Sequence, residues 1–151
     1  MTPKNIKAMG IGILNLEIDA LQALNSKQIK SITSENIALL DDKSLVSLLP
    51  RQVKALEVEQ LAELGSKISF ISEKAIGQLN KSQLEVISIE SLSEAQIKGI
   101  SISQWKSMSV AQFGNLSGLQ KNNLSESILD MFGYCKNHCD TQGVTVCKDK
   151  D

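Results

Sequence analysis

The amino-acid sequence predicts an all-α fold. We expect a right-handed superhelical solenoid of short helices on an eight-residue repeat, with a small cysteine-bearing cap at its C-terminal end. Three observations support this prediction: a small polar residue recurs every eight residues, two aliphatic residues follow it at fixed positions, and both prolines agree with the phase. We expect the repeat to occupy residues 1–118, and a C-terminal helix with the cysteine-containing cap to occupy residues 119–151.

The repeat unit starts in most cases with Ser, Thr, Asn or Asp. Aliphatic residues follow at the fifth and eighth positions, as Ile29 and Ile32 do in the unit that starts at Asn25. The starts at residues 25, 33, 41, 49 and 57 are spaced by eight, as are those at 72, 80 and 88 and those at 93, 101 and 109. Internal repeats of fixed period are typical of solenoid folds.

The fourth position of the unit is often glutamine, which predicts a capping box at the start of each helix. In a capping box the first side chain accepts a hydrogen bond from a free backbone N–H of the first helical turn. The glutamine in turn accepts from the backbone N–H of the capping residue. The predicted glutamines are Gln28, Gln52, Gln60, Gln83, Gln96, Gln104 and Gln112.

Separate short helices explain the repeat better than one long helix does. Eight residues advance an α-helix by roughly 800°, about 80° past two full turns, so the aliphatic pair would spiral around a continuous rod. We therefore expect helices of about two turns, roughly 10 Å long, each stable only because its neighbours bury its aliphatic pair. A β-solenoid would need alternating polarity and glycine-rich turns, which are largely missing.

The prolines and the irregular segments refine this prediction. Pro3 and Pro50 each directly follow a predicted cap, where a helix tolerates proline because that N–H is unpaired. The register slips by one residue over residues 64–72, and it slips again between Ser88 and Ser93. We expect longer corners or a change of direction at these places, and residues 10–24 are also irregular.

Composition and motifs exclude several classes of protein. The 151 residues are 42% hydrophobic but only 3% aromatic, and the net charge of -1 lacks the basic character of a nucleic-acid binder. No apolar run is long enough to span a bilayer, and the N-terminal residues do not resemble a signal peptide. The sequence has no phosphate-binding loop, HExxH or GxSxG motif, so we expect a non-enzymatic protein without a cofactor.

Two aromatic residues occupy the first aliphatic position of successive units. Trp105 and Phe113 are expected to be core residues, since helical core spacing usually buries an aromatic side chain. The alternative is a partner-facing patch formed by Trp105 and Phe113 with Ile102 and Val110, which lie at positions expected to be exposed.

All three cysteines, Cys135, Cys139 and Cys147, follow the repeat. A disulfide from Cys135 or Cys139 to Cys147 would suit an oxidising compartment, and the odd number leaves one thiol over. A zinc site formed by the three cysteines and His138, a thiol enzyme that uses this histidine, and reduced thiols without a role are the alternatives.

The repeat unit resembles the octad helices of the mesothelin, stereocilin and otoancorin family, best at residues 2–9 (TPKNIKAM) and 49–56 (LPRQVKAL). Similar octads occur in large bacterial surface proteins. The resemblance covers about residues 2–118 and implies a superhelical stack used for extracellular adhesion, although this chain has few prolines at the first helical position. We therefore expect an extracellular or cell-surface module that binds a protein partner. An intracellular bacterial interaction protein, either an effector or an immunity-type inhibitor, is the alternative, with a cytoplasmic location.

Overall fold

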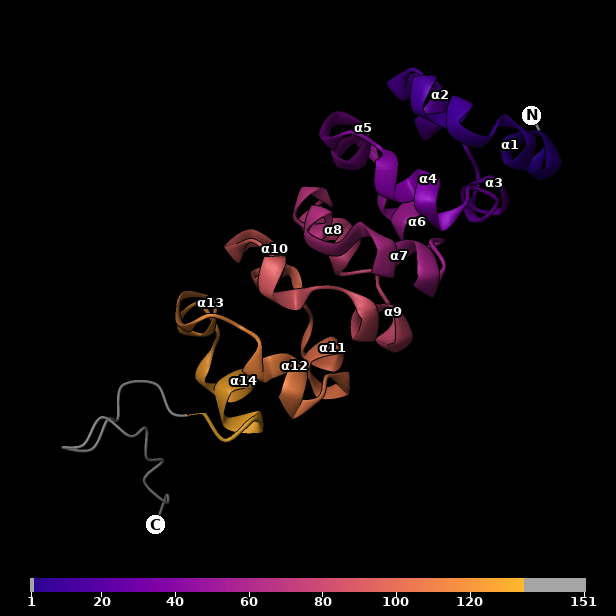
Figure 1. The fold of residues 1–151 in the computed structure, drawn as a ribbon. Coiled ribbons are helices and arrows are strands. Elements are labelled where there is room, and N and C mark those ends of the chain that lie inside the picture. Colours follow the sequence, from indigo (N-terminus) through magenta and orange to yellow (C-terminus); the bar gives the residue numbers. More distant parts are fainter. Residues whose placement is uncertain (1, 135–151) are drawn as a thin grey trace, which may run out of the picture.

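The computed structural model describes residues 2–134, and over these residues it contains helices and no β-strand, so the all-α prediction is confirmed. Figure 1 shows the helices following one another from α1 at one end of an elongated array to α14 at the other. The elements are α1 (Pro3–Met9), η1 (Gly10–Asn15), α2 (Ile18–Gln22), α3 (Ser26–Lys30), α4 (Ser34–Leu39), α5 (Asp42–Ser47), α6 (Pro50–Val53), α7 (Val58–Leu64), η2 (Gly65–Phe70), α8 (Glu73–Ile76), α9 (Lys81–Val86), η3 (Ile89–Ser91), α10 (Glu94–Gly99), α11 (Ile102–Ser107), α12 (Val110–Gly114), α13 (Gly118–Asn122) and α14 (Glu126–Met131). The η elements are 3₁₀ helices.

The α-helices are shorter than the expected two turns, with lengths from four residues in α6 to seven in α1 and α7. Several end because the second aliphatic residue of the unit leaves the helical region of backbone space. Leu40 after α4 has ψ 141°, and Leu48 after α5 has ψ 127°. These extended residues turn the chain into the next cap, so each unit ends in a corner.

The predicted capping boxes form at the N-termini of several helices. Asn25 accepts from the backbone N–H of Gln28, and the Gln28 side chain accepts from the N–H of Asn25. Reciprocal pairs of the same kind open α9, α10, α11 and α12. Where the cap is Leu49, only the glutamine half of the box exists, with the N–H of Leu49 donating to Gln52. Both prolines occupy the start of their helices, as their phase predicts.

Short capped helices are also found after residue 118. Ser117 and Gln120 form a capping box for α13, and α14 follows with Ser125 at its N-cap. The apolar pair after Ser117 is incomplete, because Lys121 occupies its first position.

The first register slip comes from a 3₁₀ segment that starts at a glycine with positive φ. Gly65 has φ 50° and ψ -127°, and Gly10 in the irregular N-terminal part has φ 51° and ψ -128°. A residue with a side chain rarely adopts this conformation. Each glycine opens a 3₁₀ helix, η2 or η1, in which the buried residue three positions later is Ile68 or Ile13. The predicted long corner is thus a compact seven-residue unit.

The second slip is a five-residue unit built on η3. Ile89 and Leu92 are buried at 1% and 3% exposure and keep the three-residue spacing of the aliphatic pair. The next cap, Ser93, directly follows Leu92. All the unit types therefore keep the same buried pair immediately before the next cap, and only the residues ahead of the pair vary in number.

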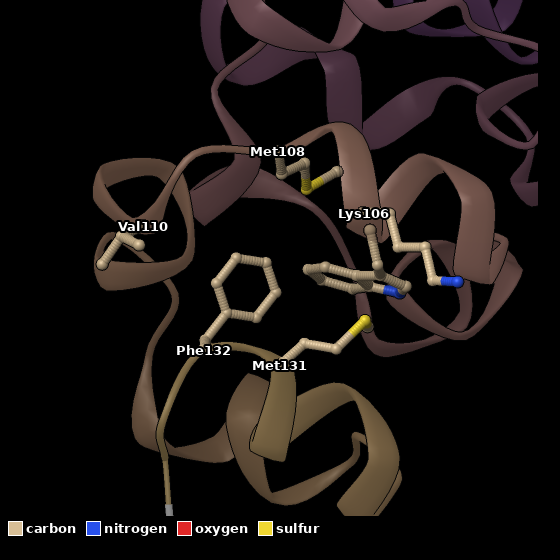
Figure 2. Close-up of a pocket in the computed structure, with 6 residues that line it drawn as sticks. Lys106, Met108, Val110, Met131 and Phe132 are labelled. Atoms are coloured by element: carbon tan, nitrogen blue, oxygen red, sulfur yellow. The ribbon is translucent and has the colours of Figure 1, made fainter.

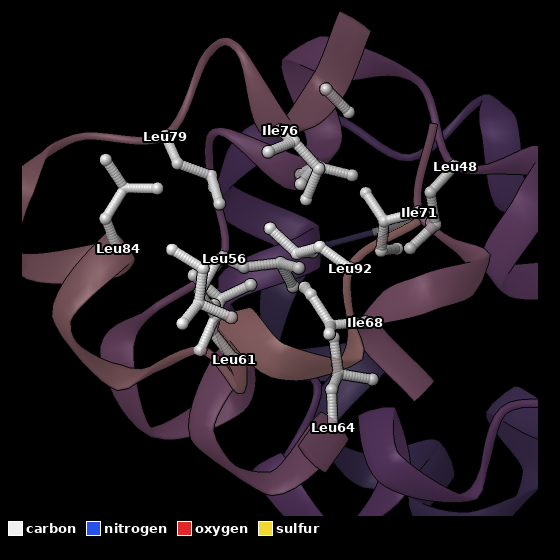
Figure 3. Close-up of a cluster of buried hydrophobic side chains, with 14 of the residues drawn as sticks. Leu48, Leu56, Leu61, Leu64, Ile68, Ile71, Ile76, Leu79, Leu84 and Leu92 are labelled. Carbon is white, nitrogen blue, oxygen red and sulfur yellow. The ribbon is translucent and has the colours of Figure 1, made fainter. Parts of the chain in front are cut away.

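The buried aliphatic pairs merge into one hydrophobic core along the array. Figure 3 shows its central part, where Leu56, Leu61, Leu64, Ile68 and Leu92 from four units converge. A buried aliphatic side chain of this size stabilises a fold by about 1.5–3 kcal/mol relative to an exposed one. The core accordingly favours the stacked arrangement over isolated short helices.

The glutamines that cap the helices also connect units that are distant in sequence. Their Nε2 atoms donate to backbone carbonyls of the buried pair about 28 residues earlier, over 2.5–3.4 Å. The complete bridges run from Gln52 to Leu21 and Leu24, from Gln60 to Ile29 and Ile32, from Gln96 to Ile68 and Ile71, from Gln104 to Ile76 and Leu79, and from Gln120 to Ile89 and Leu92. Each of these side chains is buried. We call this set the glutamine ladder.

A lysine takes the place of the glutamine at one unit of the array, and a close glycine contact occurs at another. Lys67 in η2 donates from Nζ to the carbonyls of Ala38 and Leu40, over 2.8 and 3.1 Å. Where α8 and α10 pack together, a Cβ placed on Gly99 would lie 3.1 Å from the carbonyl oxygen of Glu73. Glycine therefore permits a close backbone approach at the unit that has Ala75 in the glutamine position.

Candidate interaction surface at the C-terminal end

The last four helices surround an aromatic cluster that is absent from the rest of the described chain. The rings of Phe113 in α12 and Phe132 after α14 are stacked, with centroids 4.3 Å apart and planes 10° apart. Trp105 in α11 meets Phe132 edge-on at 6.3 Å, and Tyr134 meets Phe113 at 5.9 Å. The ammonium group of Lys121 lies 5.3 Å from the Phe113 centroid and 5.4 Å from that of Tyr134, a cation–π geometry.

The four residues of the predicted partner-facing patch do not share one exposed surface. Trp105 and Phe113 are buried at 0% and 4% exposure, in agreement with the core expectation and against the patch. Ile102 and Val110 are exposed at 57% and 70%. The fifth position of each unit points into the core, whereas the second position, where Ile102 and Val110 lie, faces away from it.

A pocket of about 390 Å³ opens beside the aromatic cluster. It is lined by Trp105, Lys106, Met108, Val110, Met131 and Phe132. Figure 2 shows Met108 and Lys106 on one side of this pocket and Met131 and Phe132, from the end of α14, on the other. We call it the aromatic groove. Its lining is apolar except for Lys106, and its two methionines have unbranched side chains that adapt to different shapes.

A second hollow of about 520 Å³ adjoins the aromatic groove, since Lys106 and Met108 line both. Its other lining residues are polar or charged and include Lys81, Ser109 and Gln112. Lys81 forms an ion pair with Glu85 over 3.8 Å, while no ion pair to Lys106 occurs within residues 2–134. Lys106 therefore lies between the apolar aromatic groove and the polar hollow beside it.

The indole N–H of Trp105 is buried and has no hydrogen-bond acceptor within the described part of the chain. Leaving a buried donor unpaired costs about 1–3 kcal/mol. Trp105 also lines the aromatic groove but is 0% exposed, so an acceptor in the groove would reach this N–H only after a lining side chain moves.

Four exposed apolar side chains lie on these helices. Ile102, Val110, Leu119 and Met131 lie on α11, α12, α13 and α14, with exposures of 57%, 70%, 73% and 39%. Val110 and Met131 also line the aromatic groove, and exposed apolar residues at a pocket are typical of interaction sites. The sequence pattern identified the first two but missed Leu119 and Met131, because it did not extend the repeat beyond residue 118.

Residue types that often serve chemistry form no cluster here. Within residues 2–134 no group of three or more His, Cys, Asp or Glu side chains could hold a metal ion. The carboxyl group of Asp41 has a lowered pKa because it accepts hydrogen bonds from Ser44, and that of Glu35 has a lowered pKa because of local bonds to its own backbone and to Thr33. Asp41 and Glu35 are both exposed residues at the start of a helix, far from the aromatic groove in sequence. Their lowered pKa values result from hydrogen bonds at the helix N-termini.

The predicted cysteine sites, Cys135, Cys139 and Cys147, lie outside the described residues together with His138. The predicted disulfide and the zinc and thiol alternatives therefore stay predictions.

Comparison of the chain with models of protein families, with curated proteins and with solved structures found no match. None of the helices within residues 2–134 is both long enough and apolar enough to cross a membrane.

Proposed function

We propose that this chain is a non-enzymatic repeat module that binds a protein partner or mediates adhesion, outside the cell or on its surface. In this proposal the array is a right-handed superhelical solenoid, similar to the octad stacks of the mesothelin family. The observation that carries the proposal is the set of exposed apolar residues on α11–α14, two of which, Val110 and Met131, line the aromatic groove. Solenoids commonly use such continuous surfaces for protein binding.

The glutamine ladder supports a scaffold role for the rest of the molecule. Within residues 2–134 seven glutamine side chains are buried, and the ladder joins units that are distant in sequence through their backbones. Polar groups that satisfy one another inside a core rigidify a structure. A rigid array presents its surface side chains in fixed positions, which reduces the entropy lost when a partner binds.

Substitution of the exposed apolar residues tests this proposal. We would immobilise the full chain, the Ile102→Asp/Leu119→Asp double variant and a control, Leu39→Asp, whose exposed side chain lies on α4 near the other end of the array. Secreted and cytosolic fractions of the source organism would be applied separately. Each captured protein would then be purified and its dissociation constant measured.

We expect a secreted or surface protein that binds the wild type and the control alike and the double variant at least tenfold more weakly. Equal binding to all three chains would overturn the proposed surface. A partner found only in the cytosolic fraction would overturn the proposed location and support the intracellular alternative. Mass spectrometry of native, non-reduced protein gives a second test of location, because three free thiols would contradict an oxidising compartment.

A further inference from the structure

We propose that the aromatic groove is the binding site for residues 135–151 of the same chain, with Val144 and Val146 as the side chains that enter it. The groove has an apolar lining, a buried indole N–H without an acceptor, and Met131 exposed at 39% at its rim. Together these features suit a polypeptide segment, because it brings aliphatic side chains and backbone carbonyls at once.

The position of the segment makes it the favoured occupant. Residues 135–151 number 17 (151 − 134), and they directly follow Tyr134, which packs on Phe113 at the edge of the cluster. Phe132, which lines the groove, is only two residues earlier. An extended chain spans at most about 3.3–3.6 Å per residue, so Val144 can return to the groove easily.

The composition of the segment fits the groove. Val144 and Val146 flank Thr145, so in an extended strand the two valines share one face. Backbone carbonyls along such a strand could accept from the Trp105 indole. Movement of Met131, which is unbranched and partly exposed, would open the way to it.

Tethering favours this occupant over a free molecule. A segment joined by a short linker has an effective concentration on the order of millimolar at its site, so even weak affinity fills the groove. A second copy of the chain would have to reach a similar concentration in solution to compete.

The four methionines of the sequence allow a direct test, since Met108 and Met131 line the groove while Met9 lies at the opposite end of the array. We would label the methionine methyl groups with carbon-13 in the full chain, replace Cys135 and Cys139 by serine, and attach a nitroxide to Cys147. We expect the Met108 and Met131 methyl signals to lose more than half of their intensity relative to the diamagnetic sample, and the Met9 signal to keep its own.

Two variants of the labelled chain separate specific binding from mere proximity. The Val144→Asn/Val146→Asn chain should recover the Met108 and Met131 signals at least twofold, and the matched Thr145→Asn control should not. Unchanged groove signals in the labelled parent, or equal behaviour of the two variants, would overturn the proposal. A mixture of nitroxide-labelled chains with separate carbon-13 chains gives the third arm, because broadening there would make a second copy the occupant and also overturn it.

Discussion

Replacing Gln60 by alanine should destabilise the protein by about 3 kcal/mol, because this one side chain makes three hydrogen bonds, two of them buried. Its Oε1 accepts from the N–H of Glu57 over 2.8 Å, and its Nε2 donates to the carbonyls of Ile29 and Ile32 over 3.0 and 2.7 Å. A typical hydrogen bond contributes about 1 kcal/mol net to stability. Alanine favours a helix, so the loss does not come from helix propensity.

Urea denaturation followed by circular dichroism measures this loss as a change in the free energy of unfolding. The matched control is Gln78→Ala, because Gln78 is exposed and its side chain has no hydrogen bond within the described residues. The control should change stability by no more than about 0.5 kcal/mol. A Gln60→Ala loss below about 1 kcal/mol, or one equal to the control, would refute the role assigned to the ladder.

A Gln60→Glu variant separates the two halves of the side chain. Glutamate keeps the acceptor for the Glu57 N–H but directs a carboxylate at two carbonyl oxygens. Burial and this repulsion should raise the pKa of the new carboxyl group above its unfolded value of about 4.3. The variant should therefore lie nearest to the wild type below that pH and lose stability as pH rises through the raised pKa. A stability difference that does not change with pH would contradict this reasoning.

Three further predictions concern the corners and caps. Gly65→Ala should lower the free energy of unfolding by about 1–3 kcal/mol, because φ is 50° at this residue. Gly114→Ala is the control: Gly114 has open space around it and an ordinary φ, so this change should be neutral or slightly stabilising. Thermal denaturation of both variants checks this prediction. Gly99→Ala should lower the free energy of unfolding, measured by urea denaturation, by about 1–3 kcal/mol, because the added Cβ would lie 3.1 Å from a backbone carbonyl oxygen of α8. A loss as small as that of Gly114→Ala would count against the close approach. Hydrogen bonds from the side chain and the backbone N–H of Ser44 lower the pKa of Asp41, so this cap stabilises the protein above the ordinary pKa of 3.8 and weakens as pH falls through the lower folded-state value. Melting temperatures from about pH 6 to about pH 2 should fall more for the wild type than for Asp41→Asn, which keeps a capping side chain, and parallel curves would exclude this contribution.

The local structure followed from the sequence because it depends on residues close together in the chain. A cap such as Asn25 and its glutamine are three residues apart, and the aliphatic pair repeats at constant spacing. Both signals are readable without knowing the fold. The same applies to Pro3 and Pro50, whose fixed φ suits the first helical position.

The long-range half of the glutamine ladder could not be read in this way. Nothing near Gln60 in the sequence shows that its amide nitrogen reaches Ile29 and Ile32, because that contact depends on which units, distant in sequence, pack against each other. One hint existed. Before residue 50 the fourth position holds Asn36 and Ser44 as well as Gln28, whereas later units prefer glutamine.

The aromatic groove was only partly predictable. Trp105 and Phe113 stood out by residue type, but Phe132 and Tyr134 lie after the last helix, outside any periodic pattern. Glycine followed by isoleucine three residues later, at Gly10 and Gly65, was a second signal that the irregular segments share one design.

The glutamine ladder affects how the length of this protein can change. Its acceptors are backbone carbonyls, and each eight-residue unit in this part of the array ends in a buried pair. Insertion of one eight-residue unit between Leu40 and Gln60 would therefore place Gln60 about 28 residues after Leu40 and give it new acceptors in that pair. Related chains should accordingly differ in length mainly by whole units.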